Sequence, residues 1–236
     1  MKTIIHKVDS RGHADYGWLK TNYSFSFANY YNPDRINFGT LRVLNDDWIE
    51  GGQGFGRHPH DNMEIVTIVL DGDLEHKDSM GNTFHIRKNE VQVMSAGTGI
   101  FHSEYNNNPN NPLKLFQIWV FPNKKNVTPR YDQKLFNPEN RVNKWQRLVS
   151  PNEPDTMWLH QDAYFSMASL NKKNELGYKL HSNNNGVYIF VIEGSIKVGE
   201  NQLERRDAVG VYETNEVMIN ASANSEVLLI EIPMSF

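Results

Sequence analysis

The chain has 236 residues, 39% of them hydrophobic, and carries a net charge of −4. At this length roughly 70% of the unfolded surface can be buried, so we expect a substantial apolar core in one large or two small domains. The acidic balance argues against direct nucleic-acid binding, which needs a concentrated basic face. The apolar runs are strand-sized and too short to span a membrane, and the charged N-terminus lacks an export signal, so we predict a cytoplasmic protein.

Cysteine is absent from the chain. This excludes disulfides, thiolate metal ligands and cysteine nucleophiles together. The chemistry of any site must therefore come from histidine, aspartate and glutamate.

Short segments rich in β-branched and aromatic residues predict strands along most of the chain. Residues 64–70 and 115–121 are examples, and turn residues border each of them. No long amphipathic helix stands out. A strand–turn–strand unit centred on Gly72 recurs around Gly194, which predicts an all-β fold of two similar barrels.

The Pro-containing polar stretch 122–129 suits a connection better than a strand. We therefore predict an N-terminal domain over residues 1–122 and a C-terminal domain over residues 131–236. The Asn-rich segment 106–112 is predicted to be a surface loop, because a strong strand follows it at once.

Two pairs of potential metal ligands have the spacing of residues that share one face of a strand. His58 and His60 project the same way around Pro59, and His102 and Glu104 form a second such pair. On adjacent strands these pairs would place three neutral imidazole nitrogens and one carboxylate around a single ion. Open positions would remain for water, dioxygen or a chelating substrate.

A single His-x-His pair is as easily explained by surface or hydrogen-bonded core histidines as by metal binding. The second pair is what favours a metal. The remaining histidines have no such partners and are predicted to be structural: His6, His13, His76, His85, His160 and His181.

The residues around these pairs resemble the two cupin motifs. Gly52, His58, His60 and Glu64 are similar to the first motif, and the stretch from Gly97 to His102 is similar to the second, although most cupins carry proline in place of Gly97. Within cupins, the resemblance is to the pirin family and covers essentially the whole chain. It is carried by His58-Pro59-His60, by residues 96–104 and by residues 25–31.

The resemblance implies two tandem cupin (jelly-roll) barrels, with one divalent metal ion in the N-terminal barrel on His58, His60, His102 and Glu104. Iron(II) is the preferred metal, and Cu, Ni, Co, Mn and Zn stay open. Many cupins use the glutamate of the first motif as a ligand. In pirins the residue matching Glu104 does so instead, which leaves Glu64 a supporting role.

The internal repeat predicts that the C-terminal barrel lacks a metal. Alignment of Gly72 with Gly194 puts Leu180 and Ser182 opposite the His58–His60 pair. One metal ion per chain is therefore expected.

The resemblance implies an enzyme similar to quercetinases, which open the ring of a flavonol such as quercetin with molecular oxygen. Glu104 could accept the proton of the substrate hydroxyl, and Phe55, Ile100 and Phe101 could supply apolar walls. A small aromatic substrate, dioxygen and a monomeric protein are expected. The alternative is a metal- and redox-dependent binding module without oxygenase activity, resembling the nuclear co-regulators of the family, with an unidentified protein partner. Another cupin reaction, such as an isomerisation, is a third reading.

Overall fold

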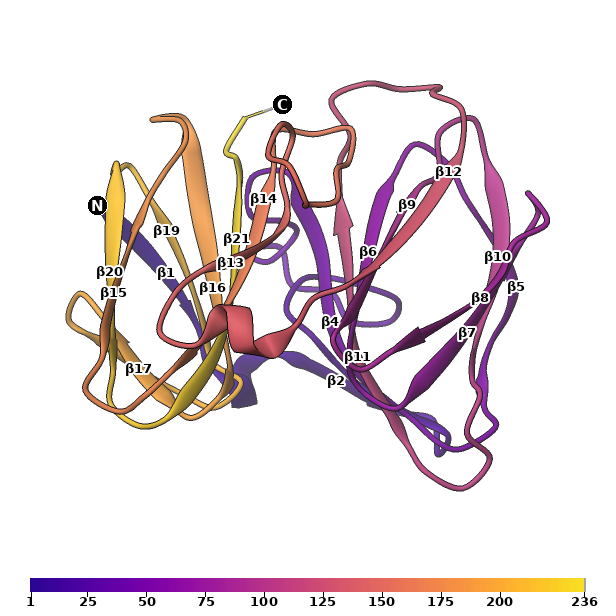
Figure 1. Cartoon of the computed structure of the whole chain (residues 1–236), viewed down its shortest axis with the longest axis horizontal. Coiled ribbons are helices and arrows are strands. Elements are labelled where there is room, and N and C mark those ends of the chain that lie inside the picture. The colour runs from indigo at the N-terminus through magenta and orange to yellow at the C-terminus, as the bar shows by residue number, and fades with distance from the viewer. Residues whose placement is uncertain (236) are drawn as a thin grey trace.

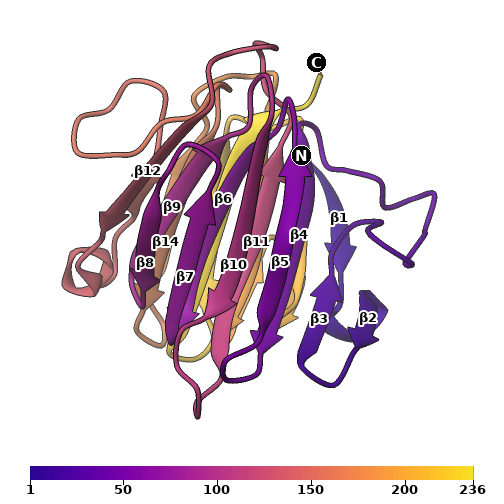
Figure 2. The same ribbon diagram turned by 90° about the vertical axis from the view of Figure 1, so that its right-hand side faces the viewer.

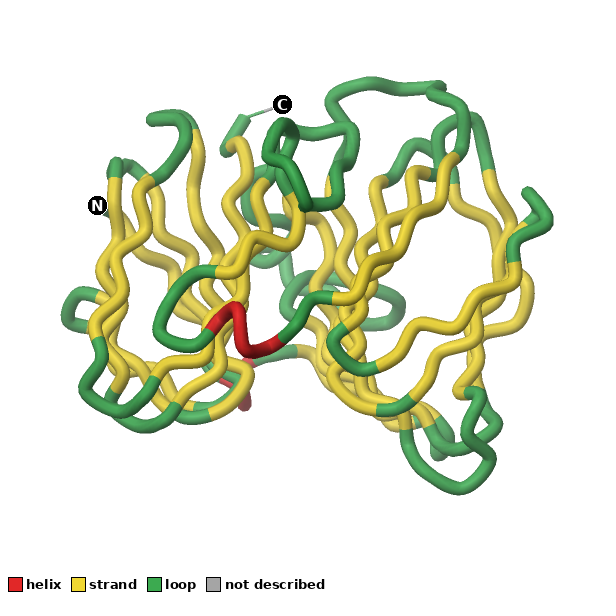
Figure 3. Tube along the Cα trace, in the orientation of Figure 1, coloured by secondary structure: helices red, strands yellow, loops and turns green. Residues whose placement is uncertain are grey.

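The computed structural model describes residues 1–235, and its regular secondary structure is almost entirely strand, as predicted. Figure 1 shows two β-barrels side by side, and Figure 3 shows how short the helical segments are. Each barrel is formed by a larger and a smaller antiparallel sheet. Among the described residues, no helix has the length and apolar character needed to cross a membrane.

The N-terminal barrel pairs a seven-stranded sheet with a four-stranded one. The larger sheet has the order β12 (Arg130–Leu135), β9 (Glu90–Ser95), β6 (Glu64–Asp71), β11 (Leu113–Val120), β4 (Leu41–Ile49), β3 (Leu19–Tyr23) and β2 (Gly12–Asp15). The smaller sheet, which faces the viewer in Figure 2, has the order β5 (Gly54–His60), β10 (Ile100–Asn106), β7 (Asp73–Asp78) and β8 (Thr83–Arg87).

The C-terminal barrel repeats this arrangement. Its larger sheet has the order β1 (Lys2–His6), β19 (Ala208–Tyr212), β16 (Asn185–Glu193), β21 (Ser225–Pro233), β14 (Tyr164–Leu170) and β13 (Gln146–Val149). Its smaller sheet has the order β15 (Glu175–Lys179), β20 (Glu216–Ala221), β17 (Ser195–Val198) and β18 (Asn201–Glu204). Two short 3₁₀ helices, η1 (Val8–Ser10) and η2 (Pro138–Arg141), lie in connections.

Strand pairing crosses the predicted domain limits at two places. β1 is the first strand of the chain but pairs with β19 in the C-terminal barrel, from Lys2 opposite Tyr212 to His6 opposite Ala208. β12 follows the predicted connection and pairs with β9 of the N-terminal barrel. Each barrel thus takes one edge strand from beyond the predicted division at residues 122–131, and residue 236 of the second predicted domain lies outside the described residues. Residues 107–112 connect β10 to β11, so the predicted surface loop begins one residue later than expected, because Asn106 is the buried last residue of β10.

The two larger sheets pack back to back, as the centre of Figure 1 shows. Their facing side chains form one apolar cluster to which both halves of the chain contribute. Phe116 of β11 and Phe190 of β16 meet edge to face with ring centroids 5.0 Å apart, and both are fully buried. Because each strand alternates its side chains, the opposite face of β11 is free to line the interior of the N-terminal barrel.

We expect Phe116→Ala to lower the free energy of unfolding by about 3–5 kcal/mol, since it leaves a cavity between the two sheets. Leu135→Ala is the control, because that side chain is 62% exposed, and its change should stay within about 0.5 kcal/mol. Guanidinium unfolding followed by circular dichroism measures both. Equal losses in the two variants would mean that this contact does not hold the sheets together.

Candidate metal centre and its cavity

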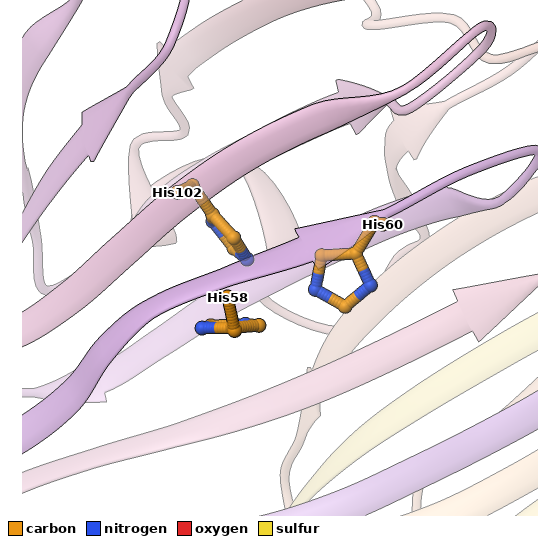
Figure 4. A group of neighbouring side chains, drawn as sticks. All are labelled: His58, His60 and His102. Atoms are coloured by element: carbon orange, nitrogen blue, oxygen red, sulfur yellow. The ribbon is translucent and has the colours of Figure 1, made fainter.

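Three histidines from two neighbouring strands meet inside the N-terminal barrel. β5 supplies His58 and His60, and β10 supplies His102, directly across from His58 in the antiparallel register. Figure 4 shows the rings projecting toward a common space. The ring centroids are 4.4 to 4.9 Å apart, and one nitrogen of each ring lies within 4.8 Å of the others.

Local backbone features bring β5 close to β10. The register shifts between His102, opposite His58, and Glu104, opposite Phe55, so β5 carries one extra residue as a β-bulge. A Cβ on Gly54 would lie 2.2 Å from the backbone oxygen of Glu104, so only glycine allows this approach.

The hydrogen bonds of the rings leave nitrogen lone pairs directed at the common space. Nδ1 of His58 is 2.8 Å from the carbonyl oxygen of Gly56, which can only accept, so Nδ1 carries the proton and Nε2 is free to ligate. Nε2 of His102 is buried and has no hydrogen-bond partner in the described part of the chain. Buried nitrogens normally have a hydrogen-bond partner, so an unpaired one with a free lone pair is expected of a metal ligand in the absence of its ion.

His76 and Asp78 orient His102. The sequence did not predict this role, since His76 was expected to have no partner at the site. Nε2 of His76 is 3.2 Å from Oδ2 of Asp78, and Nδ1 of His76 is 3.5 Å from Nδ1 of His102. Burial favours the neutral acid, but hydrogen bonds from Asn82 and His76 hold the pKa of Asp78 below its usual value. The carboxylate therefore accepts a hydrogen bond from the Nε2–H of His76, and Nδ1 of His76 can accept one from His102. This fixes the His102 tautomer that has a free Nε2.

Two of the three histidines are held in the neutral form that a metal requires. Burial, reinforced by the neighbouring histidines, lowers the pKa of His60 to about 4 and that of His102 to about 3. Neutral imidazoles are thus available at physiological pH without prior loss of a proton.

Glu104 lies on the His76 side of His102. A ligand atom from each of these three residues lies within 4.8 Å of the other two. Nε2 of Gln117, from β11 in the facing sheet, donates to both carboxylate oxygens at 3.3 and 3.0 Å. Thr67 of β6 donates in turn to Oε1 of Gln117 at 3.3 Å, so two strands of the larger sheet hold a carboxylate that comes from the smaller sheet.

Glu64 lies outside the histidine cluster and faces the other barrel. Its strand neighbours of the same parity, Val66 and Ile68, belong to the core between the barrels. Its Oε2 accepts from the hydroxyl of Ser95 at 2.7 Å and from the backbone N–H of His160 at 3.1 Å. Because the chain turns a corner between β5 and β6, the matching parity of Glu64 and His60 did not place them on one face.

A cavity opens from the histidine cluster between the two sheets. It has a volume of about 230 Å³ and is lined by polar and aromatic side chains: Phe27, Asn45, Asp47, Phe55, His58, His60, Glu104, Gln117 and Trp119. A second hollow of about 260 Å³ shares Phe27, Asn45, Asp47 and Phe55 and continues toward Tyr16, Trp18, Tyr23 and Ala28. Together they reach the ~300–1,000 Å³ typical of small-molecule sites. Of the predicted walls, Phe55 lines both hollows, Ile100 is buried in the core and Phe101 is 42% exposed.

The other histidines have structural surroundings, apart from His76. Nδ1 of His6 is 2.8 Å from the hydroxyl of Tyr188, and Nδ1 of His181 is 2.7 Å from the carboxylate of Glu231. Within residues 1–235, both groups of three metal-ligating side chains lie in the N-terminal barrel.

A family model described as "Pirin" matches residues 5–120, and one described as "Quercetinase C-terminal cupin domain" matches residues 147–232. A protein from Escherichia coli K12 named quercetin 2,3-dioxygenase is 42% identical over 230 residues, which cover 97% of this chain and 98% of the relative. The chain belongs to the pirin family. A pirin-like protein of Caulobacter vibrioides is 38% identical and covers 94% of this pirin.

Solved structures agree with the fold. The bacterial pirin YhhW from Escherichia coli, determined in complex with nickel(II), is 41% identical, superposes with a TM-score of 0.93, and covers 98% of this chain and 99% of its own. A quercetin 2,3-dioxygenase from Acinetobacter baumannii, at 20% identity and a TM-score of 0.77, shares the fold over 98% of this chain and 86% of its own. The bicupin architecture predicted from the motifs is thereby confirmed.

The pirin departs from most cupins at Gly97 for a backbone reason. Gly97 has φ of +50°, which proline cannot adopt, and a Cβ there would lie 2.0 Å from the carbonyl oxygen of Val127. That carbonyl accepts from the N–H of Thr98 at 2.9 Å, so the loop before β10 packs against the segment after β11.

We expect His76→Ala to weaken metal binding about 10- to 100-fold, because His102 would lose the partner that fixes its tautomer. His13→Ala is the control, since His13 is exposed on β2. Equilibrium dialysis with Ni(II) measures both affinities. An unchanged affinity in His76→Ala would show that His102 orients itself without this contact.

Proposed function

We propose that His58, His60, His102 and Glu104 hold one divalent metal ion. The free Nε2 atoms of His58 and His102 and the neutral His60 support the three histidines. Glu104 is included because its carboxylate lies within reach of His102 and lines the same cavity as His58 and His60. Iron(II) is the preferred ion, because a site of three imidazoles and one carboxylate suits it. The nickel(II) in the related YhhW structure supports Ni as a working probe.

We propose further that the protein is a dioxygenase that opens the ring of a flavonol such as quercetin with molecular oxygen, in the cytoplasm. The observation that carries this proposal is the aromatic-lined cavity leading from the histidine cluster. The names of relatives that cover nearly the whole chain add support. When bound, a divalent transition metal supplies Lewis-acid and redox chemistry beside the substrate.

Glu104 is the residue best placed to take the proton of the substrate hydroxyl. It lines the cavity, and Gln117 holds both its oxygens by hydrogen bonds. Trp119, with its ring 4.9 Å from that of His60, would position a planar substrate and exclude water from the cluster.

Metal content should be close to one ion per chain in the full protein and should fall in His58→Ala and His102→Ala. Both variants should stay folded, because the apolar clusters, not the ion, hold the barrels. Elemental analysis beside circular dichroism measures this. Loss of the β-sheet signal in either variant would make the site a structural one.

Glu104→Gln should keep much of the metal, since three histidines remain, but lose on the order of a hundredfold in turnover through loss of the base. Glu64→Gln should leave turnover per bound metal near that of the parent, because Glu64 faces Ser95 and His160. An oxygen electrode with iron-loaded protein and quercetin gives the rates, corrected for metal content. Roles would be reversed if Glu64→Gln lost metal and activity while Glu104→Gln matched the parent.

The same measurement decides between the enzyme and the binding module. An oxygenase must consume oxygen in proportion to the flavonol. If the metal-loaded parent consumes none with any flavonol, the redox-dependent binding module becomes the better explanation.

A further inference from the structure

Two acceptor atoms in the cavity have no donor. Asn45 and Asp47 project from β4 on the face that lines the barrel, and they are 4% and 5% exposed. Across residues 1–235, neither Oδ1 of Asn45 nor Oδ1 of Asp47 has a hydrogen-bond partner. Buried acceptors are normally satisfied, so two neighbouring exceptions on one strand face indicate something that binds there.

Both residues line the cavity at the histidine cluster and the hollow that continues from it. The rest of the lining near them is largely aromatic, with Tyr23 and Phe27 from the N-terminal segment and Phe55 from β5. Nε1 of Trp119 is also buried and without a partner among the described residues. Oγ1 of Thr21, which lies opposite Asp47 on β3 and lines the second hollow, is likewise buried and unpartnered among the described residues. The cavity thus offers flat apolar walls, two acceptors, one donor and one hydroxyl that can donate or accept.

The protonation of Asp47 is compatible with a hydrogen bond from an uncharged ligand group. Burial raises its pKa to about 7; the nearby Thr21 hydroxyl lowers that pKa, while the charges of Asp46 and Glu104 raise it further. Burial therefore favours the neutral carboxyl group over the carboxylate at this position. In both of its forms an oxygen can accept a hydrogen bond from a hydroxyl.

We propose that Asn45 and Asp47 form a subsite that accepts hydrogen bonds from phenolic hydroxyls on the part of the substrate remote from the metal. This inference rests on the proposed function for the class of substrate. It adds that the enzyme selects polyhydroxylated flavonols over those that carry only the reacting hydroxyl. Loss of a hydroxyl leaves buried acceptors unpaired, and such sites reject the analogue strongly.

The test compares two flavonols with Ni(II)-loaded protein under anaerobic conditions, so that binding is measured without turnover. Quercetin carries hydroxyls on both ring systems, and 3-hydroxyflavone carries only the 3-hydroxyl. Tryptophan fluorescence gives both dissociation constants and hence a preference ratio. The parent should prefer quercetin, and Asp47→Leu should reduce that ratio on the order of tenfold or more.

Two further variants make the result specific. Asp47→Asn retains an amide oxygen as acceptor and should keep most of the preference. Gln92→Leu is the matched control, because Gln92 is also a buried polar residue of this barrel with unpartnered amide atoms in the described chain, yet lines neither hollow. Its ratio should equal that of the parent. If Asp47→Leu does not fold, Asp47→Ala removes the same acceptor.

The subsite is overturned if the parent shows no preference, if Asp47→Leu keeps the parent's ratio, or if Gln92→Leu lowers the ratio equally. Oxygen consumption is followed separately on iron-loaded protein. Preferential binding without oxygen uptake would sink the dioxygenase and leave the subsite standing. Oxygen uptake with an unchanged ratio in Asp47→Leu would sink the subsite alone.

Discussion

The alternation of side chains on β11 and β4 is the constraint on which the molecule depends. On β11, Phe116 and Ile118 pack into the core between the barrels, while Gln117 and Trp119 face the histidine cluster. A shift of one residue in register would exchange these two sets. The apolar contact between the barrels therefore also fixes the position of the polar residues that hold Glu104.

The histidine cluster is built so that little must change when a metal arrives. Burial keeps His60 and His102 neutral. Nδ1–H of His58 donates a hydrogen bond to the carbonyl oxygen of Gly56. Asp78 and His76 act behind the ligands, where they fix the tautomer of His102 through hydrogen bonds. In His58 and His102 the proton sits on the nitrogen that faces away from the site, so these two rings can bind an ion without a change of tautomer.

Much of the site could be predicted from the sequence, because ligands two residues apart on a strand share one face. His58 and His60 share a face because they are two apart on β5, and the motif resemblance supplied the strand that pairs with them. Spacing alone did not single out His76, since the register that sets it opposite Glu104 joins strands far apart in the chain. His76 and Asp78 do form an i, i+2 pair of their own, which was the available signal. The exchange of β1 into the C-terminal barrel was equally hidden, because a five-residue strand does not encode its partner.

The second barrel answers why a repeat of the fold does not repeat the site. Trp119 pairs with Ile65, and the alignment of Gly72 with Gly194 matches Ile65 with Val187. The strand partner of Val187 is Glu231 on β21, which is therefore the counterpart of Trp119 and is fully buried. Its oxygens accept from the hydroxyl of Tyr178, the side chain of Asn185, and the backbone and ring of His181. A carboxylate so fully engaged has little left for an ion. Leu180, at the position of His58, packs into an apolar interior. The second barrel is thus filled by side chains at the place where the first is open. The outer face of its larger sheet supplies Tyr188 and Phe190 of β16 to the core between the barrels. This packing holds β11 and β4 in the register that the cavity needs.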